Sequence, residues 1–159
     1  MIIIMMRGKN MDSRLGTLEH KQRVSYYMGL VIKELIERSN NHDNTKLVGP
    51  EVELFDEYTP KLKEVTYDSP EYRQFIKELQ PALDHHYAKS RHHPEHFPNG
   101  VKDMNLVDII EMFCDWKAAS ERQLNGNILK SIEANQDRFG YSRDLGRIME
   151  NTASWFEEV

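Results

Sequence analysis

The spacing of the apolar residues constrains the fold more than any other feature of the chain. They recur at three- and four-residue intervals, the period of one buried helical face, along most of the sequence. Strand signals are nearly absent, because Val65–Tyr67 is too short to support a sheet. The pattern therefore predicts an all-α fold, a single bundle of about six or seven helices.

Local signals indicate where these helices begin. Thr17 is expected to cap a first helix that runs to about residue 38, with Val24 and Val31 on its inward face. Ser69 followed by Pro70 predicts another start, because serine caps helices and proline favours the first helical position. One face of this helix is apolar and is expected to point inward, and His86 continues that face. Further helical segments are expected at residues 51–58, 104–124, 128–135 and 142–156, with a short one between His42 and Gly49.

The length of 159 residues leaves room for one domain of ordinary size. We expect this domain to span residues 17–159, after a tail of residues 1–16. The sequence leaves open whether translation starts at Met1 or Met11. Hydrophobic residues make up 39% and charged residues 30% of the chain, a balance that supports a packed core.

Charge and cysteine content exclude several classes of protein. The net charge of −5 argues against general nucleic-acid binding. The single Cys114, expected in the core, rules out an intramolecular disulfide and a CxxC zinc knuckle, and a reducing cytoplasm fits best. No apolar run approaches the roughly 18 residues that span a bilayer, so no membrane association is expected.

Histidine is the unusual residue, since five of the seven histidines fall between positions 85 and 96. His20 lies on the inward stripe of the first helix, and His42 and Asp43 are adjacent 22 residues later. A further helix carries Glu111 and Asp115 one turn apart, with Asp108 expected on a solvated face. Histidine and carboxylate together suit divalent manganese, iron, cobalt, nickel or zinc.

The order of these residues resembles that of the HD-domain metal-dependent phosphohydrolases. The segment His42-Asp43-Asn44-Thr45-Lys46 is similar to their HDxxK signature, and Asp115 resembles their closing aspartate. The similarity covers roughly residues 17–120, and small HD-like proteins of phages and bacteria look similar too. A GYP sequence is missing after the histidine pair, which argues against the cyclic-di-GMP phosphodiesterase subgroup.

The resemblance implies a divalent transition metal, as one or two ions, inside an HD-type helical bundle. One ion would be held by His20, His42, Asp43 and Asp115. A second would be held by one residue of each of two pairs, His85 or His86 and His92 or His93. Lys46 would then contact a substrate phosphate.

The expected reaction is hydrolysis of a phosphate ester or anhydride in a small substrate, with a nucleotide favoured. Glu111 is expected to orient a metal-binding histidine, and His93 would protonate the leaving oxygen if only one ion binds. Substrate contacts are expected from Lys46 and from a basic mouth, and Trp116 is expected either to stack on a base or to lie in the core. The residues of this basic mouth are Lys89, Arg91, Lys117 and Arg122.

Two other functions remain open at this point. Some HD-like folds hold two irons and perform oxygenation with the same order of ligands. The chain could also be a non-enzymatic helical binding protein, such as a phage-type inhibitor. The sequence does not decide the metal, the substrate or whether the chain forms a homo-oligomer.

Overall fold

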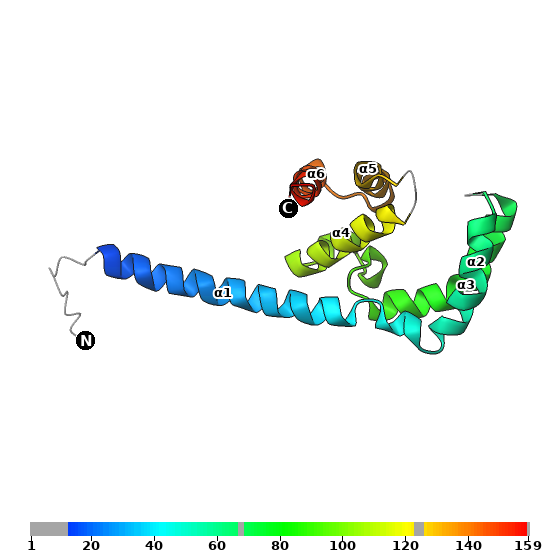
Figure 1. Ribbon diagram of the computed structural model, residues 1–159, viewed down its shortest axis with the longest axis horizontal. Helices are drawn as coiled ribbons and strands as arrows, with labels where there is room; N and C mark the ends of the chain where they lie inside the picture. The colour runs from blue at the N-terminus through cyan, green and yellow to red at the C-terminus, as the bar shows by residue number, and fades with distance from the viewer. Residues whose placement is uncertain (1–12, 67–68, 123–125, 159) are drawn as a thin grey trace. The chain divides into compact units, whose positions relative to one another are not determined.

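The computed structural model describes residues 13–66, 69–122 and 126–158. Over these residues it contains six α-helices and no strand, which confirms the predicted all-α class (Figure 1). The chain divides into two compact units between Glu37 and Arg38, inside the first helix. Residues 1–12 of the expected tail, with Met1 and Met11, lie outside the described residues.

The helices agree in order with those expected, although several are longer. Their bounds are α1 Ser13–Asn41, α2 Glu51–Glu64, α3 Pro70–Lys89, α4 Leu106–Glu121, α5 Ile128–Phe139 and α6 Arg143–Phe156. Three short 3-10 turns join them, namely η1 Asn44–Leu47, η2 Pro94–His96 and η3 Gly100–Asp103. The two turns η2 and η3 lie in the segment that connects α3 to α4.

Polar side chains begin several of these helices. The hydroxyl of Ser69 accepts a hydrogen bond from the backbone N–H of Tyr72 at 3.1 Å, as expected for the start of α3. Asn105 caps α4 and forms a capping box with Asp108. Gly140 ends α5 with a φ of 63°, a left-handed conformation that glycine adopts without strain.

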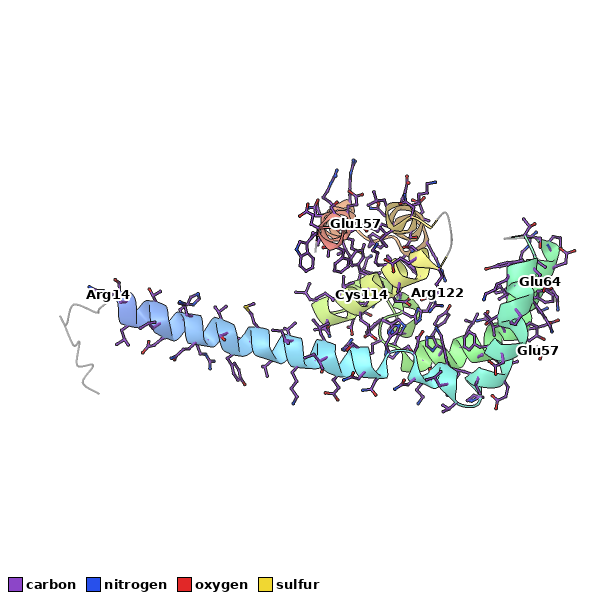
Figure 2. All side chains as sticks on the ribbon, in the orientation of Figure 1. Arg14, Glu57, Glu64, Cys114, Arg122 and Glu157 are labelled. Carbon is purple, nitrogen blue, oxygen red and sulfur yellow. The ribbon has the colours of Figure 1, made fainter. Side chains whose placement is uncertain are left out.

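The first unit contains α1 up to Glu37, and here the expected inward stripe is wrong. Val24 and Val31 are 41% and 42% exposed. Apolar side chains occur on every side of the helix, because Leu18, Val24 and Tyr26 lie in different directions at 100° per residue. Figure 2 shows side chains projecting from α1 along its whole length. Thr17 is not the cap: it lies within α1.

The second unit, residues 38–159, contains two apolar clusters. The smaller one packs α2 against α3, which run side by side in Figure 1, through Tyr58, Leu79 and Ala82. The larger one joins α4, α5 and α6. Its buried residues are Val101, Met112, Phe113, Ile132, Tyr141, Met149 and Ala153. A third set of buried residues belongs to neither cluster, and its side chains are polar.

Two further expectations can be compared with the structure. Cys114, expected in the core, is exposed on α4 (Figure 2). None of the helices in the described part of the chain is long and apolar enough to cross a membrane.

Candidate metal centre

The polar cluster begins where α1 ends. His42 and Asp43 directly follow Asn41, the last residue of α1. Asp43 has a φ of 57° and a ψ of 12°, the left-handed conformation that aspartate tolerates better than most residues. The bend separates α1 from η1, where the N–H of Lys46 donates to the carbonyl of Asp43 at 2.9 Å. Strained backbone of this kind collects at functional sites.

Helix α3 and the loop after it supply three more histidines. His86 lies in the last turn of α3 and is 1% exposed, so the expected continuation of the apolar stripe is confirmed. His92 and His93 follow Ser90, the C-cap of the helix, and the N–H of His93 donates to the carbonyl of Ser90 at 3.2 Å. His92 is also buried. All three rings therefore come from one short stretch of the chain, at the end of α3 and just after it.

Asp43 stands at the centre of the cluster. Its Oδ1 lies 3.3 Å from Nε2 of His86 and 3.4 Å from Nε2 of His92. Its Oδ2 lies 3.7 Å from Nε2 of His42 and accepts a hydrogen bond from Nζ of Lys46 at 2.7 Å. The two oxygens of this carboxylate thus face different histidines: Oδ1 faces His86 and His92, and Oδ2 faces His42. Asp115 also faces His42, with Oδ1 3.5 Å from Nε2 of that ring.

Two glutamates lie behind the histidines and fix the direction of the rings. Nδ1 of His42 lies 3.0 Å and Nδ1 of His92 lies 3.2 Å from Oε1 of Glu111. Nδ1 of His86 lies 3.1 Å from Oε2 of Glu51. Because a carboxylate oxygen only accepts hydrogen bonds, these contacts favour a proton on Nδ1 and turn each Nε2 towards the centre of the cluster. This tautomer is the one that binds a metal through Nε2.

The result is a set of acceptors that face one another. Among the described residues, Oδ1 of Asp43 and Nε2 of His92 are buried and have no hydrogen-bond partner. A buried polar atom without a partner is costly and calls for an explanation. A cation between the two atoms satisfies both at once, since each offers a lone pair.

The donor atoms form groups that can hold a metal ion. One group is Asp43 with His86, His92 and His93, and another is His42 with Asp43 and Asp115. Within each group all the donor atoms lie within 4.8 Å of one another. The groups share Asp43, so its carboxylate is placed to bridge two ions. A third group combines His42, His92 and Glu111.

The charges in the cluster shift the pKa values of its histidines in opposite directions. The hydrogen bond to Asp115, followed by that to Glu111, raises the pKa of His42 to about 10. Burial, followed by the charge of His92, lowers the pKa of His93 to about 3. His93 is therefore neutral at pH 7 and keeps a lone pair for a ligand.

The central carboxylate is held in its charged form. Burial alone would raise the pKa of Asp43. The close approach of His86 and His92 and the hydrogen bond from Nζ of Lys46 outweigh burial and hold the pKa of Asp43 well below its usual range. A charged carboxylate surrounded by imidazole nitrogens is a suitable binding site for a divalent ion.

Three other histidines belong to none of the candidate metal groups of the described residues. His20 is exposed on α1 in the first unit, and it belongs to none of the metal-binding groups of the described residues. His85 stands outside these groups too: its Nδ1 lies 2.7 Å from Oε1 of Glu51. Of the pair His85 and His86, the structure therefore brings only His86 to the cluster. His96, expected in a loop role, donates from Nδ1 to the carbonyl of Tyr87 at 2.9 Å.

The expected substrate-binding residues are mostly occupied in other ways. Trp116 lies against the larger apolar cluster, stacked between Phe139 and Tyr141 with ring centroids 6.1 and 6.2 Å away. These contacts support the core role that was one of the two expected for this ring. Arg91 pairs with a buried carboxylate.

The remaining basic residues differ in their distance from the cluster. Lys46 contacts Asp43 directly, as expected for a residue beside the metal site. Lys89 ends α3 and is exposed. Arg122 lies beyond the end of α4, two turns and roughly 10 Å along the axis from Asp115. In the described part of the chain, Lys46 is the residue of this basic set that contacts a member of the candidate metal groups.

Sequence reasoning missed the residues that hold the ligands in place. Glu51 is fully buried, although it was expected only as the start of a short helix. Asp108, expected on a solvated face, is also fully buried and is paired with Arg38 and Arg91. The available signal was its spacing, because Asp108 lies one turn before Glu111 on the same face of α4.

A family model matches almost the whole chain. It describes a family of unknown function, DUF5662, and it covers residues 9–159. The chain belongs to this family. No curated protein and no solved structure matches the chain. For this DUF5662 protein the geometry of the metal centre therefore carries the functional argument.

Proposed function

We propose that this DUF5662 protein is a metal-dependent phosphohydrolase that cleaves a phosphate ester or anhydride, with a nucleotide as the favoured substrate. The observation that carries the proposal is the approach of Oδ1 of Asp43 to Nε2 of His92 at 3.4 Å. Both atoms are buried without a hydrogen-bond partner, and a divalent cation suits them both.

The residues that would hold the metal come from three segments of the second unit. They are His42, Asp43, His86, His92, His93 and Asp115. This mixture of imidazole and carboxylate favours manganese, iron, cobalt, nickel or zinc, as one or two ions. When bound, such an ion lowers the pKa of a coordinated water and polarises a phosphoryl oxygen. The order of these residues along the chain supports the resemblance to HD-domain phosphohydrolases.

Two residues of this chain would act on the substrate. Nζ of Lys46 is partly exposed and already pairs with an acidic group, Asp43, at 2.7 Å. It can offset negative charge that develops on the phosphoryl oxygens. His93 keeps a neutral ring, because burial lowers its pKa to about 3. Its Nε2 is therefore suited to bind an ion, whereas the expected donation of a proton to the leaving oxygen would need a charged ring, which this low pKa disfavours.

The same donor set favours a second candidate, a di-iron oxygenase. Four histidines around a shared carboxylate suit two irons as well as two other divalent ions. Oxygen uptake with iron bound separates this candidate from hydrolysis. A non-enzymatic binding protein is less well supported, because nothing in that role requires six ligand residues to converge.

The test is a screen of nucleotides and generic phosphoesters with each of the five metals supplied in turn. We expect the wild-type protein to release phosphate or a nucleoside product, and Asp43→Asn to lose turnover. Asparagine is the better replacement here, because it tolerates the left-handed φ of 57° that alanine would strain. Helical circular dichroism should be unchanged in the variant.

Asp56→Asn is the matched control, since Asp56 is an exposed aspartate on α2. It should retain the turnover of the wild type. No hydrolysis by the wild type with any of these metals would refute the hydrolase proposal. Full turnover in Asp43→Asn would do so as well.

A further inference from the structure

Asp108 is a buried carboxylate that the proposed reaction does not use. It is fully buried and accepts four hydrogen bonds. Oδ1 accepts from Nη1 of Arg38 at 2.7 Å and from Nε of Arg91 at 3.0 Å. Oδ2 accepts from Nη2 of Arg91 at 2.9 Å and from the backbone N–H of Asn105 at 2.9 Å. Arg91 thus grips both oxygens in a bidentate pair.

These charges join the segments that carry the metal ligands. Arg38 lies one helical turn before His42, near the end of α1. Arg91 directly precedes His92 in the loop after α3. Asp108 lies on the first turn of α4, two turns before the last carboxylate of the cluster. Two ion pairs therefore tie three segments far apart in sequence to one point.

The network also reaches the ligands through a glutamate. Nη1 of Arg38 donates to Oε2 of Glu111 at 3.2 Å while it holds Asp108. The other oxygen of Glu111 faces Nδ1 of His42 and Nδ1 of His92. Arg38 therefore fixes which way the carboxylate of Glu111 turns, and Glu111 fixes the tautomer of both rings.

We propose that Asp108, Arg38 and Arg91 together position the residues of the metal centre. Their ion pairs set the spacing of the three ligand-bearing segments and orient Glu111. This inference rests on the metal site of the proposed function and deepens it. Buried ion pairs contribute little net stability, because the cost of removing charges from water offsets their attraction. Their better-attested use is to fix one arrangement among several.

A purely structural role for Asp108 is the competing explanation, because it also belongs to the capping box of α4. The two roles separate at Asn105. Its side chain accepts from the N–H of Val107 and of Asp108 and takes no part in the ion pairs. Asn105→Ala therefore removes the cap and leaves the network, whereas Asp108→Asn weakens the network.

The test measures Co²⁺ binding to the full-length chain by competition with a chromophoric chelator, together with the visible absorption of bound Co²⁺. We expect Asp108→Asn to raise the dissociation constant about 10- to 100-fold and to change the absorption spectrum. Arg91→Lys should do the same, because lysine keeps the charge and loses the bidentate grip. Asn105→Ala should match the wild type in both measurements.

If Asp108→Asn does not fold, Arg91→Lys alone carries the test, since Arg91 is exposed enough to be replaced safely. Wild-type affinity and spectrum in both variants would overturn the proposal, and so would an equal loss in Asn105→Ala. A wild type that binds no Co²⁺ would overturn the metal centre too. A wild type that binds Co²⁺ but hydrolyses no phosphoester would overturn the proposed function alone.

Discussion

Helix α4 has two buried faces, and they depend on different partners. On one face Phe113 packs into the larger apolar cluster at 4% exposure. On the other face Asp108 and Glu111 carry carboxylates inward, towards arginine and histidine. Apolar burial stabilises the fold without any ligand, whereas a buried carboxylate requires a cation beside it. One helix therefore combines an apolar face that builds the fold with a carboxylate face that we propose supports a metal.

The largest effect on stability should come from the apolar face. Phe113→Ala removes a ring that stacks on Phe156 with centroids 5.8 Å apart. We expect a loss of about 3–5 kcal/mol in the free energy of unfolding, from lost burial and the cavity left behind. Urea denaturation measures it. A loss under about 1 kcal/mol would mean that this face does not hold the fold.

The carboxylate face should respond to metal. Saturating metal, at about 100 times its dissociation constant, should stabilise the wild type by about 2.7 kcal/mol and raise its thermal midpoint. Asp115→Asn removes a ligand and should lose most of this increment. Differential scanning calorimetry with and without metal measures both. An equal increment in the variant would exclude Asp115 from the metal centre.

The cap of α4 should have a smaller effect that involves neither face. Asn105→Ala leaves two backbone N–H groups without the side-chain acceptor that they have in the wild type. We expect a loss of about 1 kcal/mol in the free energy of unfolding. The metal-dependent rise in thermal midpoint should stay at its wild-type size. A smaller rise would show that the cap and the carboxylate face are coupled.

The smallest effect is expected at Arg122, just beyond the end of α4. Its side chain is exposed. Arg122→Gln should change the free energy of unfolding by less than about 0.5 kcal/mol. It should also leave the Michaelis constant for any substrate found in the screen unchanged. A raised Michaelis constant would restore Arg122 to the basic mouth that the sequence suggested.

Much of the fold could be predicted from local signals. Helical spacing predicted the all-α class, and Ser69 with Pro70 predicted the start of α3, because a cap depends only on its neighbours in sequence. The apolar stripe correctly turned His86 inward. The stripe on α1 failed at Val24, because apolar residues occur all around that helix and no single face is selected.

The candidate site could be predicted in its ligand types and less well in its supports. Asp43 and its adjacent histidine stood out as a motif, and the structure brings them together with Asp115. The role of Arg91 could not be foreseen, since it depends on Asp108, which comes near only after folding. His85 and His86 are adjacent, but they point about 100° apart on α3, and the structure places only His86 in a metal-binding group. The HD resemblance itself stays a prediction.

The measurement that tests the central claim most directly is the metal content of the purified protein. After reconstitution and removal of free metal, mass spectrometry should find about one or two equivalents of a transition metal in the wild type. Asp43→Asn, with unchanged helical circular dichroism, should retain almost none. A wild type without bound metal would contradict the account, and so would an Asp43→Asn variant that holds as much metal as the wild type.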